Sequence, residues 1–221
     1  MNRTILLAFA GIFATTANVY AAPPDITLSA DKRIVTLNSA STTFTPPPSK
    51  SGLTTIYSNL ATLDPKGVYM AGTGYAIGGP ASPIGQAWYA APFTPASNAS
   101  ADEIDVAAGD LNGINETVTV TLYADASGLP GQELWSHNAT VTPAGGCCGL
   151  VAVSVKGGVP LTAGTQYWVG LTTPSSGTGT FAAWFFNVAD QVDTGLAVEN
   201  LGSGWFSQPL LPNVAFGVYS K

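Results

Sequence analysis

Two adjacent cysteines are the residues of this sequence with the most distinctive chemistry. Cys147 and Cys148 are its only cysteines, and Gly145, Gly146 and Gly149 surround them. A metal site needs several converging ligands, whereas neighbours on a strand point to opposite faces. A redox pair favours a Cys-x-x-Cys spacing. We therefore expect a disulfide between the two neighbours, with intermolecular disulfides as the alternative.

Such a bond would close a small, strained ring. Adjacent Cα atoms lie about 3.8 Å apart across a trans peptide, which is closer than the roughly 4.4–6.8 Å of ordinary disulfides. The three glycines would let the flanking backbone adopt the angles that the ring requires. An oxidised pair also implies an oxidising compartment outside the cytosol.

His137 and a group of acidic residues are the candidates for catalysis or metal binding. A catalytic His137 would need a nucleophile and an orienting carboxylate, and no Gly-x-Ser-x-Gly motif accompanies it, so the sequence favours a solvent-exposed histidine at a strand end. The acids between Asp102 and Asn112 could supply oxygen ligands to Ca²⁺, but they lack the spacing of an EF-hand loop. They favour a solvated strand edge. We expect no catalytic residue, no metal site and no cofactor.

Two tryptophans are the candidates for ligand binding. Trp205 lies in a glycine-flanked stretch, and Trp168 shares a strand face with Gln166, opposite Tyr167 and Val169. Both rings could lie at the surface, where exposed aromatic faces beside polar side chains would be able to stack on sugars. The competing interpretation, which the usual burial of tryptophan favours, is that both are core or loop-pinning aromatic residues.

These residues must be positioned by strands, because the sequence has the pattern of an all-β protein. Short runs of β-branched and aromatic residues alternate with Gly, Pro, Asn and Asp, which predicts a single antiparallel β-sandwich, jelly-roll-like, with no helix. In 117–123, valine and leucine alternate with threonine, so one face should be core and the other wet. By contrast, 181–186 is apolar on both faces, which indicates a central or covered strand. The predicted strands are 55–58, 75–78, 86–93, 103–107, 117–124, 133–137, 150–155, 166–171, 181–187 and 214–219.

The first fifty residues have a different composition from the rest. Residues 1–22 have a basic start, an apolar core and a small-residue cleavage site, which are typical of a cleaved signal peptide. Residues 23–50 form a Ser/Thr/Pro-rich leader, to which one edge strand at 34–37 could belong. Residues 51–221 form the β-sandwich domain. We expect a secreted protein, extracellular or periplasmic, with no membrane span after cleavage.

Charge excludes one class of partner. The formal net charge is −6, cleavage would remove Arg3, and charged residues make up 9% of the chain. An acidic chain with no Lys/Arg cluster beyond Lys32-Arg33 is a poor ligand for nucleic acid.

Several stretches in this order resemble one bacterial family. They are Thr55-Ile-Tyr-Ser-Asn59, Ala91-Pro-Phe-Thr94, 117–123 followed by Asp125-Ala-Ser-Gly-Leu-Pro-Gly131, Gly146-Cys-Cys148 and Leu161-Thr-Ala-Gly-Thr-Gln-Tyr-Trp168. Together they are similar to the choice-of-anchor R domain, over residues 53–219. The resemblance implies a secreted bacterial all-β domain without assigned catalytic residues. Members commonly carry a C-terminal sorting tail, and its absence from this sequence favours release.

The sequence therefore predicts a non-enzymatic module that acts through a surface, with a polysaccharide or cell-surface glycan as its partner. Trp205, Trp168 and Gln166 are the expected ligand-binding residues. The alternatives are a secreted hydrolase acting on polysaccharide through His137 and the acids near Asp102, and a matrix or adhesion component that pairs with itself through sheet edges.

Overall fold

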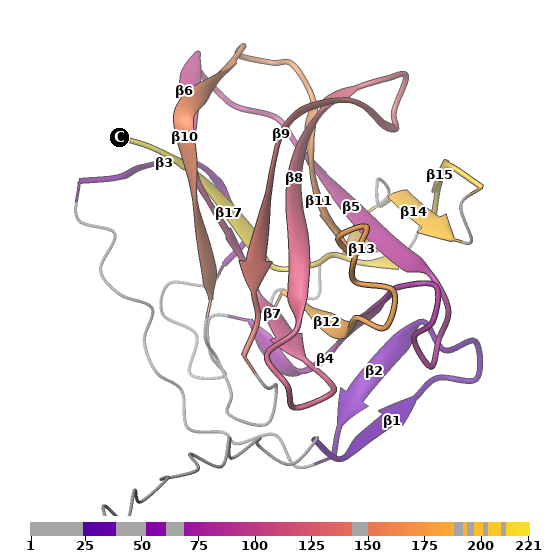
Figure 1. Ribbon diagram of the computed structural model, residues 1–221. Coiled ribbons are helices and arrows are strands. Elements are labelled where there is room, and N and C mark those ends of the chain that lie inside the picture. The colour runs from indigo at the N-terminus through magenta and orange to yellow at the C-terminus, as the bar shows by residue number, and fades with distance from the viewer. Residues whose placement is uncertain are drawn as a thin grey trace, which may run out of the picture.

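The described part of the chain is a β-sandwich, as the sequence predicted (Figure 1). The computed structural model describes residues 24–38, 52–60, 69–142, 150–187, 192–193, 197–200, 203–208 and 211–221. These residues form strands, turns and loops, and among them there is no helix that could cross a membrane. The strands are β1 (Ile26–Leu28), β2 (Ile34–Leu37), β3 (Thr54–Ser58), β4 (Met70–Gly78), β5 (Ala87–Phe93), β6 (Ala99–Val106), β7 (Ala108–Asp110), β8 (Thr117–Asp125), β9 (Pro130–Thr140), β10 (Val151–Leu161), β11 (Tyr167–Thr172), β12 (Phe181–Phe186), β13 (Val192–Asp193), β14 (Ala197–Asn200), β15 (Trp205–Ser207), β16 (Leu211–Pro212) and β17 (Phe216–Ser220).

Two antiparallel sheets make up the sandwich. The main path of the larger sheet runs β1-β2-β4-β5-β11-β8-β9, and the smaller sheet has the order β10-β6-β17-β3. In the larger sheet, β12 also pairs with β4 and β7, while β14 pairs with β5 and β15. Strands that are far apart in the sequence, such as β5 and β11, are therefore neighbours in space. Each of the ten predicted strands overlaps an observed strand.

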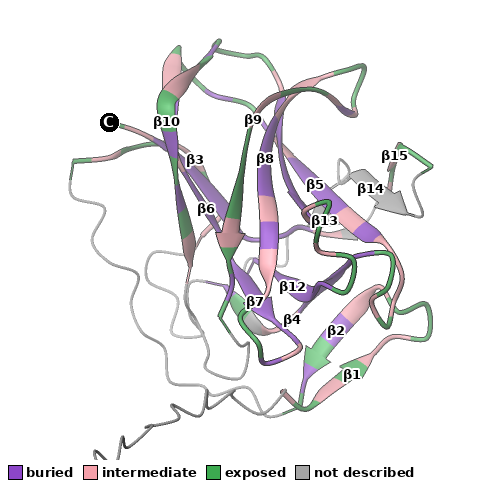
Figure 2. Ribbon diagram, viewed as in Figure 1, coloured by how far each residue is buried: buried purple, intermediate pink, exposed green. Residues whose placement is uncertain are grey.

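The main core lies between the two sheets and follows from the alternation of residues along each strand. In β8, Val118, Val120 and Leu122 are fully buried in this core, whereas Thr119 between them is only partly buried on the other face. The predicted core face is confirmed, but the other face is only partly wet, because Thr121 on that face is 1% exposed. In Figure 2, β8 is mostly buried or intermediate, whereas the edge strand β9 is largely exposed or intermediate.

Strand β12 is buried on both faces, as its apolar sequence predicted. Its even-numbered residues, among them Trp184, belong to the main core. Its odd-numbered residues, among them Phe185, belong to a second core cluster with Val35, Leu37 and Ala215. The strand lies between β4 and β7, so that it is central rather than at an edge.

Part of the segment that the sequence assigned to the leader belongs to the larger sheet. β1 and β2 form a hairpin, and β2 pairs with β4 through Ile34 opposite Tyr75. The predicted edge strand at 34–37 is present. Val35 and Leu37 are buried in the second core cluster, so the hairpin also contributes to packing. The predicted boundary near residue 50 lies outside the described residues.

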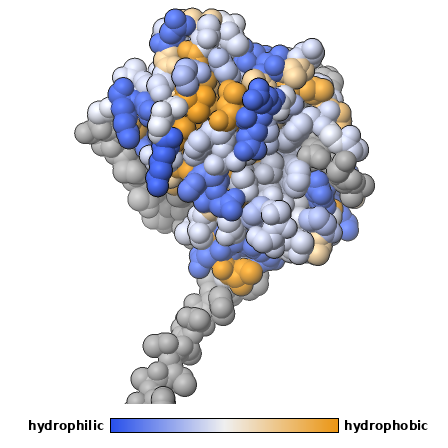
Figure 3. Space-filling view, turned by 45° about the horizontal axis from the view of Figure 1, so that its top comes forward, coloured by the Kyte–Doolittle hydropathy of each residue, from blue (hydrophilic) through white to orange (hydrophobic). Residues whose placement is uncertain are grey.

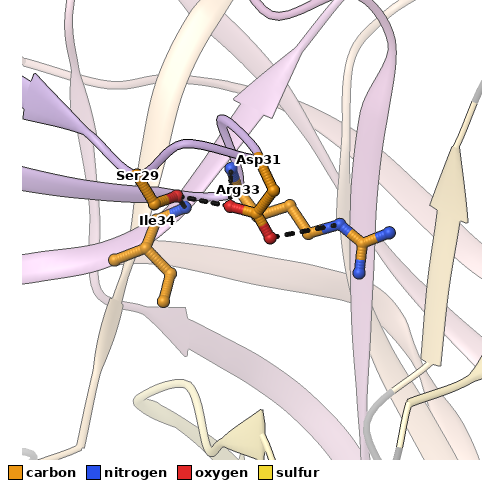
Figure 4. A network of polar contacts seen from close by, with 4 residues as sticks. All are labelled: Ser29, Asp31, Arg33 and Ile34. Carbon is orange, nitrogen blue, oxygen red and sulfur yellow. Dashed lines mark hydrogen bonds and ion pairs between the residues drawn. The ribbon is translucent and has the colours of Figure 1, made fainter.

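The turn of this hairpin is held by a local polar network (Figure 4). Ser29 Oγ donates to Asp31 Oδ1 over 2.6 Å and accepts the backbone N–H of Ile34 over 2.9 Å. Arg33 donates its backbone N–H to Asp31 and approaches the same carboxylate through Nε at 3.9 Å. The hydrogen bond from Ser29 is the largest of the effects that lower the pKa of Asp31. The network pairs the polar groups of the turn with one another, which is a structural role.

The surface has the character that the low charge content predicted. Much of the face in Figure 3 has near-neutral hydropathy, and hydrophobic side chains gather in its upper part beside strongly hydrophilic ones.

Candidate functional site

A groove on the outer face of the larger sheet is the best candidate for a binding site. It is open to solvent, has a volume of about 460 Å³, and crosses β5, β11, β8 and β9 together with the loop that follows β11. Its lining residues are Trp88, Thr119, Thr121, Tyr123, Glu133, Ser136, Asn138, Thr172, Thr173, Pro174, Ser175 and Ser176.

The sheet's alternation explains why these residues meet on one face. The side chains of Val120, Leu171 and Tyr89 point into the main core, so their neighbours along β8, β11 and β5 point outward. Cross-strand pairing then places Thr172 opposite Thr119. The groove is thus the wet face that the valine–threonine alternation of β8 predicted, extended over three more strands.

The lining is rich in hydroxyl groups and has little charge. Two aromatic residues, Trp88 and Tyr123, and one amide, Asn138, lie among the threonines and serines, and Glu133 is the one charged residue in the lining. Hydroxyls and amides both donate and accept hydrogen bonds, and aromatic faces offer an apolar platform. This combination suits a ligand that has apolar faces and many hydroxyls.

The ring of Trp88 is held in position within the groove. Its Nε1 donates a hydrogen bond of 3.1 Å to Thr173 Oγ1, and the side chain is only partly buried. The bond ties β5 to the loop after β11. A ring whose orientation is already set loses little conformational freedom when a ligand binds.

The ring of Tyr123 is held by contacts with two residues. It lies over Gly170 of β11, where a Cβ would come within 2.7 Å of Cε2 of the tyrosine. It also meets Trp205 in a T-shaped contact, with ring centroids 5.9 Å apart and an interplanar angle of 70°. Gly170 is therefore the residue whose missing side chain makes room for this ring.

Asp125 organises the residues beside the groove. Its Oδ1 accepts hydrogen bonds from Gln166 Nε2 at 2.7 Å and from Trp168 Nε1 at 2.8 Å. Its Oδ2 accepts the backbone N–H of Gly128 at 3.1 Å, within the turn between β8 and β9. Partial burial alone would raise the pKa of Asp125, but the hydrogen bonds from Trp168, Gly128 and Gln166 outweigh it and hold that pKa below its ordinary range.

The predicted exposure of Trp168 is wrong. The residue does lie on the outer face, opposite Tyr167 and Val169 as expected, but its side chain is only 1% exposed. Tyr123, Leu129 and Trp205 cover it in a small outer cluster with Ala90. Outward orientation was read correctly from the strand, but the covering side chains come from other strands and a turn.

None of the three predicted ligand residues is among the residues that line the groove. Trp168 and Gln166 are bound to Asp125, and Trp205 is partly buried against Tyr123. The groove residues that sequence reasoning missed are Trp88 and Tyr123. The sequence did hold a signal for both residues. Each is next to a core residue in its strand, as Trp88 is next to Tyr89, and neighbouring side chains on a strand point to opposite faces.

The interpretation of the acidic residues as a solvated strand edge is wrong for two of them. Asp105 and Asp110 are both fully buried. Asp110 accepts the backbone N–H groups of Asn112, Ile114 and Asn115 over 2.6–2.7 Å, so its carboxylate holds together the loop before β8. Within the described ranges, no group of three or more His, Cys, Asp or Glu residues could hold a metal ion.

His137 lies away from the groove lining. It is exposed on β9 and stacks on Trp135, with ring centroids 6.0 Å apart. In the described part of the chain the ion pair found is between Arg33 and Asp31, and it does not involve His137. Asp102 belongs to β6 of the smaller sheet. Among the described residues, no ion pair joins a carboxylate to His137.

Cys147 and Cys148 lie outside the described residues, so the bond between them stays a prediction. Comparisons with known protein families, curated proteins and solved structures found no match. The resemblance to the choice-of-anchor R domain likewise stays a prediction, and the function rests on the groove itself.

Proposed function

We propose that this chain is a secreted, non-enzymatic β-sandwich that binds carbohydrate through the outer-face groove. The observation that carries the proposal is the pair of fixed aromatic rings, Trp88 and Tyr123, within a lining of hydroxyl and amide groups. The rings would stack on the apolar faces of sugars, while Thr, Ser and Asn side chains would exchange hydrogen bonds with sugar hydroxyls.

The signal-like N-terminus supports the secreted part of the proposal, since extracellular polysaccharides would then be within reach. The absence of a motif for nucleophilic catalysis, together with the solitary stacking of His137 on Trp135, supports binding without turnover.

Binding to immobilised cellulose, xylan, mannan and chitin tests the proposal. We expect retention on at least one of them, and an affinity at least about tenfold lower for Trp88→Ala, because the substitution removes one stacking platform worth about 1.4 kcal/mol. Trp135→Ala is the matched control, since Trp135 is also partly buried but lies outside the groove lining. Equal binding by Trp88→Ala and the parent would refute this site.

A further inference from the structure

The lining of the groove extends diagonally across the sheet, from Trp88 on β5 to Glu133 on β9. The strand register places Trp88 of β5 level with Thr172 of β11, which pairs with Thr119 of β8. Tyr123 lies four residues further along β8 and pairs with Glu133 of β9. With about 3.3 Å per residue along a strand and about 4.8 Å between strands, the Cα atoms of Trp88 and Tyr123 are about 16 Å apart, and Glu133 lies one strand further still. The ring of Tyr123 leans back over Gly170 of β11, so the two rings are closer together than their Cα atoms, but the lining as a whole is longer than one sugar unit.

Polar side chains line the groove beside the two rings. Thr119 and Thr121 follow one another along the outer face of β8, and Ser136 and Asn138 flank them on β9. Thr121 is only 1% exposed, so the accessible polar groups are those of Thr119, Ser136 and Asn138. Thr119 Oγ1 and Asn138 Oδ1 are already joined by a hydrogen bond of 2.8 Å, so this part of the floor is preorganised. A ligand that lies along the groove would meet these polar groups as well as the aromatic rings.

The electrostatics of the groove favour an uncharged ligand. Glu133 is exposed, accepts a hydrogen bond from Ser136, and has no basic residue beside it in the lining. The chain as a whole has a formal net charge of −6. An anionic polysaccharide would therefore be repelled both by the groove and by the surface around it.

Resting on the proposed function, we infer that the groove binds an extended stretch of an uncharged polysaccharide, several sugar units long, that lies along the lining from Trp88 to Glu133. The open shape lets the chain continue past both rings, so the ligand is bound along its length and not by its end. Binding strength should therefore depend on chain length, and both rings should be needed for the full effect.

Calorimetric titration with cello-, xylo-, manno- and N-acetylated chito-oligosaccharides of one to six units tests this inference. We expect the best series to gain at least about a hundredfold in affinity from one unit to six. Trp88→Ala and Tyr123→Ala should each reduce that gain to about tenfold or less, and Trp135→Ala should leave it intact. A monosaccharide that binds as tightly as its hexasaccharide would overturn the inference but leave carbohydrate binding standing. No binding in any series or to the parent polymers would overturn the proposed function itself.

The expected preference of the groove for uncharged ligands is tested by comparing an anionic with an uncharged hexasaccharide. At low ionic strength, where screening is weak, an oligogalacturonide hexamer should bind at least about tenfold more weakly than the best uncharged hexamer. Glu133→Gln should narrow that difference several-fold, whereas Glu103→Gln, which removes the same charge from the smaller sheet, should not. Equal or tighter binding of the anionic hexamer by the parent would overturn the uncharged part of the inference.

Discussion

At the scale of single residues, Asp125 has the largest role among the side chains that shape the site. Both of its oxygens are occupied, one by the side chains of Gln166 and Trp168 and the other by the backbone of Gly128. An ionised carboxylate can accept all three hydrogen bonds, and bonds to a charged acceptor are stronger than those to a neutral one. Asp125 thereby connects the turn after β8 to the outer face of β11.

Asp125→Asn should reduce the free energy of unfolding at pH 7 by about 1–2 kcal/mol. The asparagine side chain has one accepting oxygen, and its NH₂ group would face one of the hydrogen-bond donors that now bind the carboxylate. The pKa of Asp125 is depressed in the folded protein, so its stabilising effect is present above the unfolded-state pKa and is lost as the pH falls through the folded one. The stability difference between parent and variant should shrink below about pH 4, as urea unfolding at several pH values would measure.

Asp25→Asn provides the control for this measurement. Asp25 is exposed and accepts a single side-chain hydrogen bond from Asn38. Its substitution should change the unfolding free energy by less than about 0.5 kcal/mol. A difference between Asp125→Asn and the parent that stays constant from pH 7 to pH 2 would contradict the role given to the carboxylate.

At the scale of elements, β11 determines what the groove can present. Its odd-numbered residues Tyr167, Val169 and Leu171 build the main core, and its even-numbered positions face outward. Gly170 is the outward position that lies under the ring of Tyr123. A glycine in a strand interior costs stability in general, but here it lets an aromatic side chain from the next strand lie across the backbone.

Gly170→Ala should displace the ring of Tyr123, because the new Cβ would lie 2.7 Å from Cε2 of the tyrosine. We expect oligosaccharide affinity to fall about three- to tenfold, a loss of about 1 kcal/mol, with unfolding cooperativity retained because the tyrosine side chain can move aside. Calorimetric titration together with thermal unfolding would measure both effects.

Gly179→Ala is the matched control, since a Cβ at Gly179 would meet no atom within 4 Å. It should bind as the parent does. If Gly170→Ala also bound as tightly as the parent, the position of the Tyr123 ring would not matter for the ligand.

At the scale of the whole molecule, the sandwich begins before the segment that composition marks as the domain. The hairpin of β1 and β2 extends the larger sheet beyond β4 and closes the second core cluster. Lys32 also donates from Nζ to the backbone carbonyl of Pro83 over 3.2 Å, which ties the hairpin turn to the loop after β4. Residues 24–38 are therefore part of the folded unit.

A chain that begins at residue 39 should be less stable than one that begins at residue 24. Loss of the hairpin removes the buried side chains of Val35 and Leu37 and uncovers part of the second core cluster, which should cost about 3–5 kcal/mol. Urea unfolding of the two chains measures the difference. Equal midpoints and slopes would show that the hairpin is dispensable, contrary to the packing described above.

Local pattern was enough to predict the major strands and their inner faces. The alternation in β8 and the doubly apolar run of β12 are properties of consecutive residues, because side chains on a strand change face at every position. Two short strands, β7 and β14, had no comparable signal. They exist because a partner strand supplies their hydrogen bonds, and the partner of β14 begins at Ala87, far away in the sequence.

The sequence by itself determined that this protein is an all-β sandwich, and that Trp168 faces away from the core. Only the tertiary structure decided that Trp205, Tyr123 and Leu129 cover Trp168, and that Trp88 and Tyr123 line one groove. The physical reason is that orientation within a strand depends on immediate neighbours, whereas the coverage of a side chain depends on pairing between strands that are distant in the sequence. The candidate site is a product of that pairing.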